Sequence, residues 1–343
     1  MRLPFVRGLF ASLAIALASP VLAPVHAQGE ASITEEMAML ADWMEEFRPV
    51  TSGLLDVLNP VDEADLALAS FVEGDIDQTM ARARVFAAKE DVLAIGEALR
   101  ADVAALPPFP QMTYINNPRL EANVGEIETM LDSLENTAIS LIDTYAAALD
   151  GDEEATDKLA ELGFDRAKAS IEVMNQITAA DIASIADEQH PQKAVLSSAY
   201  VNNEIVILFL GIEKGRQNDY SEQAEVDALR EVDRKIAEAR EIIRDGKTGQ
   251  ANLISRFQTM KLLAAASDKG AVESVLAMLR AYDQAWPVEA EMAMIWEELA
   301  ASYRSISPAY DTSMVYTDAF DRLTPLEDKR QQLIFDRVAL MKQ

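Results

Sequence analysis

The chain has 343 residues, of which 50% are hydrophobic and 26% charged, and these values exclude wholesale disorder. Its 58 acidic and 30 basic residues give a formal net charge of −28, which disfavours nucleic acid and anionic lipid surfaces as partners and leaves a basic partner or a cation open. The absence of cysteine excludes disulfides, lipidation at a cysteine and thiol catalysis.

The first 27 residues have the pattern of a secretory signal peptide. Arg2 and Arg7 precede an apolar run at 9–18, and Val25-His26-Ala27 places small residues at −3 and −1 of a cleavage site after Ala27. The apolar run is about half of the ~20 residues that a membrane span needs, so an uncleaved anchor is the weaker alternative. We expect a periplasmic or secreted mature chain, without stable membrane insertion, whose only histidine is His190.

Helical periodicity runs through nearly every long segment, and no period-two run of comparable length is present. Apolar residues alternate at spacings of three and four along two seams. The first seam consists of Val124, Ile127, Leu131, Leu134, Ala138, Leu141, Tyr145 and Ala148, and the second of Leu229, Val232, Ile236, Ala239 and Ile243. The sequence therefore predicts an all-α fold, a multi-helix antiparallel bundle of about ten helices with coiled-coil-like packing and no substantial sheet.

Helix ends are marked by capping residues, prolines and glycines. Capping boxes are expected at Ser32 with Glu35 and at 324–327, and Asn117-Pro118 is typical of an N-cap followed by proline at the first helical position. Turns are expected near Asn59-Pro60, Gly74-Asp75, Asp150-Gly151, His190-Pro191, 215–219, 246–249 and Trp286-Pro287.

Two irregular stretches, 106–118 and 305–317, interrupt the helical pattern with prolines and aromatic residues. We expect a signal peptide at 1–27, an N-terminal helical subdomain at 28–106, a Pro/aromatic connector at 107–118 and the main helical bundle at 119–343. Whether residues 28–106 form a separate domain stays open.

The helix expected from about Gln192 to Gly215 contains an amide within its apolar stripe. Asn203 lies among Leu196, Ala199, Val206 and Leu210, and a buried amide needs hydrogen-bond partners. One interpretation is that Asn203 bonds a facing helix and fixes its register. The other is a small polar ligand cavity formed by Asn203, Tyr200 and Glu204.

The two irregular stretches also supply a candidate contact surface. It consists of Phe109, Tyr114, Tyr310, Met314 and Tyr316, residue types that interfaces favour. The same side chains could instead fold back and plug the ends of the bundle, and the sequence does not separate the two.

Metal sites are weakly indicated. Asp187 and His190 have the i, i+3 spacing of helical carboxylate-bridged sites, but a second such pair is missing and His190 precedes a proline, so a solvated turn is preferred. An EF-hand-like spacing has Ala155 in place of the usual glycine and Lys158 at the ninth place, and its acidic positions are Asp150, Asp152, Glu154, Thr156 and Glu161. An acidic loop that caps the helix beginning near Glu153 explains them, and we expect neither metal nor cofactor.

Two further motifs are incomplete. Gly246-Lys247-Thr248 has Glu241 where a phosphate-binding loop needs glycine, and we interpret it as a turn between helices. Val272-Glu273-Ser274 resembles the surroundings of the single catalytic glutamate of all-helical lytic transglycosylases, without the glycine and aromatic motifs of their sugar groove. A solvated helix face is the simpler interpretation.

These observations favour an exported, non-enzymatic helical binding or scaffold protein of the cell envelope that contacts a protein or peptide partner. A periplasmic small-molecule sensor or carrier with its ligand between helices near Asn203 is the first alternative. A carboxylate-only glycosidase or lytic transglycosylase-like enzyme is the second. A homo-oligomer is compatible with each, because heptad seams pack equally well between chains.

Overall fold

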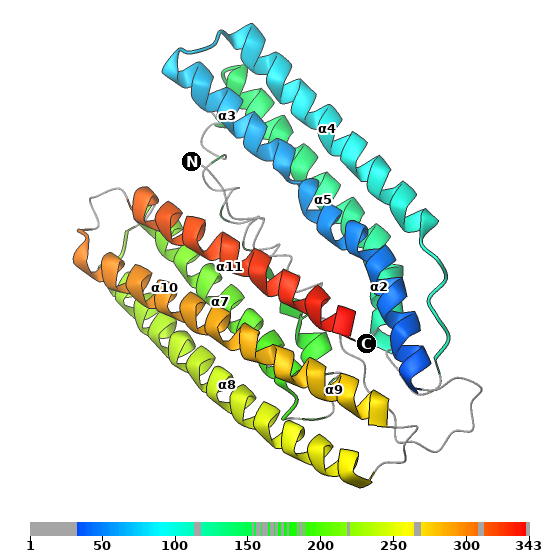
Figure 1. Cartoon of the computed structure of the whole chain (residues 1–343). Helices are drawn as coiled ribbons and strands as arrows, with labels where there is room; N and C mark the ends of the chain where they lie inside the picture. Colours follow the sequence, from blue (N-terminus) through cyan, green and yellow to red (C-terminus); the bar gives the residue numbers. More distant parts are fainter. Residues whose placement is uncertain are drawn as a thin grey trace. The chain divides into compact units, whose positions relative to one another are not determined.

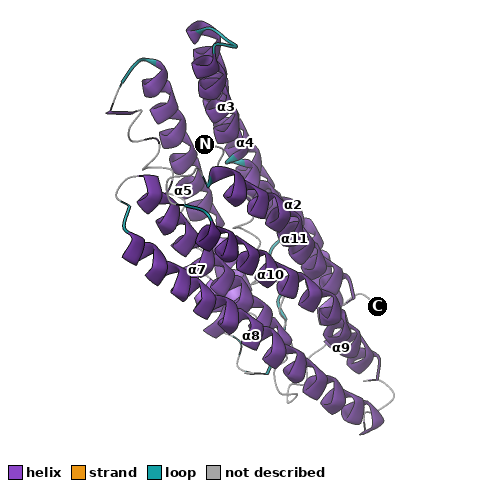
Figure 2. Ribbon diagram, turned by 90° about the vertical axis from the view of Figure 1, so that its left-hand side faces the viewer, coloured by secondary structure: helices purple, strands orange, loops and turns teal. Residues whose placement is uncertain are grey.

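The structure is a computed structural model that describes residues 33–112, 118–152, 189–217, 220–263, 269–307 and 312–340, with scattered residues between 154 and 187. Within these residues the chain is helical and contains no strand (Figure 2), which confirms the predicted all-α bundle. The expected signal peptide and Ser32 lie outside the described residues.

The helices are labelled in Figure 1. They are α2 (Ile33–Asp56), α3 (Asn59–Glu73), α4 (Gln78–Ala105), α5 (Pro118–Leu149), α7 (Pro191–Gln217), α8 (Glu222–Leu263), α9 (Lys269–Ala281), the 3₁₀ turn η1 (Tyr282–Gln284), α10 (Ala285–Ser305) and α11 (Ser313–Ala339). They fall into two compact units, of which one includes Phe47–Leu106 and Asn123–Ser170 and the other includes Ile171–Gln343. The sequence-based division at 28–106, 107–118 and 119–343 stays a prediction.

In the first unit, α4 and α5 run antiparallel. Three ion pairs join the two helices: Arg82 with Asp150, Lys89 with Asp143 and Arg100 with Asp132. From one pair to the next, the residue number rises along α4 and falls along α5. The seam predicted in α5 is buried at Ile127, Leu131, Leu134, Ala138, Leu141 and Tyr145. Burial of this stripe is what holds a helix of this length in place, because propensity alone contributes little.

In the second unit, α7, α8, α10 and α11 alternate in direction (Figure 1). Two ion pairs join each neighbouring pair of helices, and residue numbers rise along one helix as they fall along the other. The pairs are Glu204–Lys235 and Arg216–Glu225 between α7 and α8, Asp233–Arg304 and Arg240–Glu297 between α8 and α10, and Glu289–Arg330 and Glu298–Arg322 between α10 and α11. The second predicted seam, Leu229 to Ile243, is buried at all five positions. The core of this unit is therefore a four-helix bundle.

The turn predicted at 246–249 is wrong, because α8 continues without interruption from Glu222 to Leu263. Gly246 and Gly249 permit close packing against α8. A Cβ on Gly246 would lie 2.6 Å from the Cβ of Ala194, and one on Gly249 would lie 2.1 Å from the carbonyl oxygen of Gln189. Glycine permits the chain at the start of α7 to approach the backbone of α8.

The helix start predicted at 324–327 is also wrong. α11 begins at Ser313 and continues through Pro325, so residues 313–317 of the expected irregular stretch are helical. The Thr324 hydroxyl donates to the Phe320 carbonyl at 2.9 Å, one turn earlier. Burial of Leu323 and Leu326 on either side of the proline outweighs its missing N–H group.

Other predicted boundaries agree with the structure. Gly74 and Gly151 follow helix ends with φ of 82° and 83°, a left-handed conformation that glycine adopts without strain. α5 begins with the predicted proline, Pro118, and α7 begins at Pro191, one residue before the expected start at Gln192. The turn expected near Trp286-Pro287 corresponds to η1 just before α10.

Among the described residues, one helix is long and apolar enough to cross a membrane, the Pro191–Arg216 part of α7. Of its most apolar stretch, 67% is buried inside the protein, as in a core helix.

Candidate ligand site on α7 and α8

α7 is an apolar helix in which four buried polar residues each bond to a different point of η1 or α10. We call these four contacts the polar ladder. Gln192 accepts from the Tyr282 hydroxyl at 2.7 Å, Ser198 donates to Glu289 at 2.7 Å, Asn202 accepts from Trp296 Nε1 at 3.2 Å, and Glu213 accepts from the Tyr303 hydroxyl. The ladder aligns α7 parallel to α10 and gives each of these buried side chains at least one hydrogen bond.

Asn203, which the sequence analysis singled out, points to another neighbour. Its Nδ2 atom donates to Oδ1 of Asn175 at 3.0 Å, and both side chains are buried. A hydrogen bond to a facing segment is the arrangement expected of a register-fixing amide. Asn203 itself does not line the cavity beside it.

That cavity has a volume of about 460 Å³ and lies between α7, α8 and residues 172–179. Tyr200 and Glu204, the other two residues of the predicted ligand site, both line it. Its apolar wall includes Ile207 and Leu208 of α7. Tyr200, Glu204 and Ile207 share one side of α7 because positions three and four apart are neighbours on a helix.

The charge at this cavity centres on Lys235 of α8, whose side chain is 12% exposed. Its ammonium nitrogen lies 2.5 Å from Glu204 Oε2 and 3.2 Å from Glu238 Oε2. Burial opposes the charged form of Lys235, but the hydrogen bonds to the two carboxylates prevail and raise its pKa. Lys235 therefore holds Glu204 in place at the edge of the cavity.

A second carboxylate, Glu231, lines the same cavity. Arg234 donates to it, with one bond of 2.8 Å, and these hydrogen bonds lower the pKa of Glu231. With Glu172 included, the cavity is lined by three carboxylates and one ammonium group. Such a lining favours a ligand that has a cationic group and a small apolar part.

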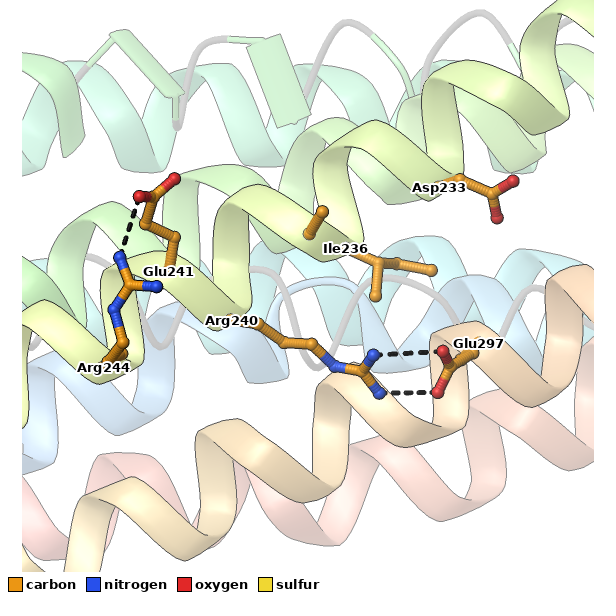
Figure 3. A pocket seen from close by; sticks show the side chains of 7 residues that line it. Asp233, Ile236, Arg240, Glu241, Arg244 and Glu297 are labelled. Carbon is orange, nitrogen blue, oxygen red and sulfur yellow. Dashed lines mark hydrogen bonds and ion pairs between the residues drawn. The ribbon is translucent and has the colours of Figure 1, made fainter.

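A second cavity of about 460 Å³ lies on the surface formed by α8 and α10 (Figure 3). Its charged groups are paired, as they are at the first cavity: Arg240 donates to Glu297 at 2.6 and 3.1 Å, Arg244 donates to Glu241 at 2.8 Å, and Asp233 pairs with Arg304. These side chains are about half exposed or more, and only Ile236 and Ala237 add apolar lining. A ligand in this cavity would bury little apolar surface, so we do not take it as the candidate site.

The predicted aromatic contact residues are not gathered into one exposed patch. The Phe109 ring packs edge-on against Trp43 at 5.1 Å between centroids, and Tyr316 is buried in α11 against Phe320 at 4.6 Å. Met314 is 82% exposed. Tyr114 and Tyr310 lie outside the described residues.

His190 lies in a turn, as predicted, but its side chain is half-buried, where the sequence favours a solvated one. Its Nδ1 atom accepts a hydrogen bond of 3.2 Å from the backbone N–H of Gln192, and its ring meets Tyr282 edge-on. The pKa of His190 is lowered to about 4, mainly by burial; Asp187 opposes the shift and Arg337 adds to it. A neutral imidazole thus caps the start of α7.

The acidic loop at 150–152 has the capping geometry expected from the sequence. Asp152 accepts from the backbone N–H of Ala155 at 3.1 Å, and Asp150 pairs with Arg82. Thr156 and Glu161 lie outside the described residues. In the part of the chain that is described, no group of three or more His, Asp or Glu side chains could hold a metal ion.

Glu273 does not have the surroundings of a proton-donating acid. It is exposed and paired with Lys261, which lowers its pKa, whereas a general acid needs a raised one. Sequence reasoning missed two enclosed carboxylates, Glu289 and Glu327, which share the buried guanidinium of Arg330. Neither of them lines the cavity beside Tyr200 and Glu204.

Comparisons of the chain with protein-family models, curated proteins and solved structures gave no match. The function has to be argued from the site itself, since an all-α bundle hosts many activities. Among the features above, the cavity beside Tyr200 and Glu204 has the best combination of apolar wall, buried charge and access.

Proposed function

We propose that the chain is an exported, non-enzymatic helical protein that binds a small organic cation in the cavity between α7 and α8. The observation that carries this proposal is the cavity lining, in which carboxylates outnumber the one ammonium group beside the apolar side chains of Ile207 and Leu208. The formal net charge of −28 adds a long-range attraction for cations. Export rests on the leader pattern of residues 1–27.

The structure supports this small-molecule carrier or sensor over the partner-binding scaffold that the sequence favours. A contact surface built from the aromatic loops needs Phe109 and Tyr316 to be exposed together, and both pack against other aromatic rings. A ligand cavity needs Tyr200 and Glu204 on one rim, and both line the same cavity.

The test is a binding measurement with defined probes, namely butylamine, spermidine and butyrate, by thermal shift and calorimetry. We expect the two amines to raise the melting temperature and butyrate to leave it unchanged. A ligand at 100 times its dissociation constant stabilises the folded state by about 2.7 kcal/mol, which thermal shift detects readily.

Glu204→Gln and Glu297→Gln make a matched pair of variants. Each removes one carboxylate that bonds a cation of α8 at the edge of a cavity of about 460 Å³. We expect Glu204→Gln to weaken amine binding at least about tenfold, and Glu297→Gln to leave it unchanged. Equal loss in both variants would mean that amines respond to the overall charge, and would contradict the proposed site.

A further inference from the structure

The carboxylate of Glu204, at the edge of the α7–α8 cavity, is already bonded to a cation of the chain itself. Lys235 Nζ lies 2.5 Å from Glu204 Oε2, and both residues line the cavity. Their side chains are 12% and 28% exposed, so water screens the pair only in part. Among the described residues, Lys235 is the one cation that bonds Glu204. A cationic ligand at this carboxylate therefore competes with Lys235.

Lys235 has a second carboxylate within reach, that of Glu238. Its Nζ lies 3.2 Å from Glu238 Oε2, and the two residues are three positions apart on α8, where side chains are neighbours on the helix surface. Glu238 does not line the cavity, and its Oε2 also lies 3.5 Å from Arg234. A lysine side chain has a flexible four-carbon stem, so a small rotation carries its charge from one carboxylate towards the other. Lys235 can thus release Glu204 and stay paired.

The place that Lys235 holds indicates which kind of cation can replace it. Lysine ends in a primary ammonium with three N–H donors, carried on a butyl stem. A primary alkylammonium would donate to Glu204 as Lys235 does, and its stem would lie against Ile207 and Leu208, which line the same cavity. A quaternary ammonium has the same charge but no N–H donor, so it cannot replace the hydrogen bond to Glu204.

We propose that the ligand is a primary alkylammonium and that it displaces Lys235 from Glu204, with Lys235 left on Glu238. Lys235 is then a built-in competitor that sets the affinity of the cavity. When only a fraction of the molecules has Glu204 free, the apparent dissociation constant rises by the inverse of that fraction. Lys235 acts at the proposed cation site, so this proposal rests on the proposed function.

Lys235→Met tests the competition. Methionine keeps an apolar stem and removes the competing charge, and calorimetry measures the affinity for butylamine. We expect binding at least about tenfold tighter than in the native chain. Arg240→Met is the matched control, because it removes one positive charge of α8 that is paired with Glu297 at the other cavity. It should change the affinity by less than about twofold.

Lys235→Gln supplies a second neutral variant, which retains an N–H donor for Glu204. It should also bind butylamine more tightly than the native chain, and circular dichroism verifies that each variant is folded.

Butyltrimethylammonium tests the class of ligand, because it has the stem and the charge of butylamine without its N–H donors. We expect it to bind the native chain at least about tenfold more weakly than butylamine. Equal affinities would show that the cavity responds to charge alone, and would overturn the assignment of a primary ammonium.

The outcomes separate the role of Lys235 from the proposed function. Butylamine binding that is no tighter in Lys235→Met and Lys235→Gln than in Arg240→Met would overturn the role of Lys235 and leave the cation site standing. Binding by the two Lys235 variants alone would support that role, because Lys235 then outcompetes the amine in the native chain. Absence of butylamine binding in the native chain and in all three variants would overturn both.

Discussion

The buried carboxylates Glu289 and Glu327 share a single guanidinium, that of Arg330, and all three side chains are at least nine-tenths buried. Ser198 adds one hydrogen bond to Glu289. The cost of desolvating such a cluster offsets most of its Coulombic attraction, so it adds little net stability. Its main effect is on the protonation of its carboxylates. Removal of Arg330 would leave two buried carboxylates without this guanidinium, whereas removal of either carboxylate leaves a one-to-one pair.

Glu327 gives the first pH prediction. Burial raises its pKa from the ordinary value of 4.5 to about 7, although Arg330 opposes the shift. Between these values the folded chain holds more protons than the unfolded chain, so this group makes the protein more stable as pH falls from 7 to 4.5, and that stability is lost as pH rises through 7. We expect a contribution of roughly 1–3 kcal/mol.

Urea denaturation of the native chain and of Glu327→Gln between pH 8 and pH 5 measures this contribution. The difference in free energy of unfolding between the two should grow on acidification. Asp328→Asn, which neutralises the next residue along α11, is the control and should follow the native curve. A native-to-Gln difference that stays constant with pH would show that Glu327 does not titrate in this window.

For His190 we predict the opposite dependence of stability on pH. Its pKa is lowered from 6.5 to about 4, so the unfolded chain binds the extra proton first, and this stability is lost as pH falls below 6.5. His190→Asn retains a side chain able to cap α7 and cannot titrate. We expect its free energy of unfolding to decrease less than that of the native chain between pH 7 and pH 5, again in urea denaturation. A parallel decrease would contradict the burial of a neutral imidazole.

At the scale of the helix, α8 shows how a packed neighbour can reverse the usual effect of a substitution on stability. Replacing a helical glycine with alanine normally stabilises a protein by about 1 kcal/mol. In Gly249→Ala the new methyl group would meet the Gln189 carbonyl, and we expect destabilisation of roughly 1–3 kcal/mol in chemical denaturation. Gly211→Ala in α7, where a Cβ meets nothing within 4 Å, should be neutral or stabilising. Stabilisation by both substitutions would mean that α7 and α8 are not tightly packed.

The helical seams were predictable because their signal is contained in one segment. Spacings of three and four from Ile127 to Tyr145 and from Leu229 to Ile243 define a buried stripe without knowledge of the partner. Gly246 and Pro325 misled the prediction for the opposite reason. Their local preference for turns is overridden by neighbours that are distant in sequence, Trp286 and Ala194 for the glycine and the buried leucines of α11 for the proline.

The candidate site was predictable only in part. Tyr200 and Glu204 stand out because they flank an amide in an apolar helix, which is a local pattern. Lys235 lies 31 residues beyond Glu204, and its role depends on the register of α8 against α7. One hint was present in the sequence, since Lys235 stands directly beside the seam residue Ile236, where a lysine is half-covered by the neighbouring helix.

For the molecule as a whole, the formal net charge of −28 produces electrostatic repulsion that acts over longer distances than any single contact. Ion pairs such as Lys89 with Asp143 and Arg240 with Glu297 are exposed, and surface pairs of this kind contribute about 0–1 kcal/mol each. Repulsion among the excess carboxylates acts over the entire surface and destabilises the compact state.

We therefore expect the melting temperature to rise when sodium chloride is increased from low to physiological ionic strength, where the Debye length is about 8 Å. Screening reduces repulsion among the many unpaired acids more than attraction within the few close pairs. Thermal unfolding followed by circular dichroism measures the effect, with sucrose as an uncharged control solute. A fall in melting temperature with salt would show that the interhelical ion pairs dominate.

The spacing of the polar ladder restricts how α7 and α10 can slide past each other. Its partners on the α10 side, Tyr282, Glu289, Trp296 and Tyr303, recur at every seventh residue, whereas those on α7, Gln192, Ser198, Asn202 and Glu213, are unevenly spaced. A shift of α10 by two turns would place Glu289 opposite Gln192 and Trp296 opposite Ser198, and Glu213 would lose its hydrogen bond to Tyr303. The native alignment is therefore distinguished by its matched donors and acceptors, and above all by the Glu213–Tyr303 bond at the end of the ladder.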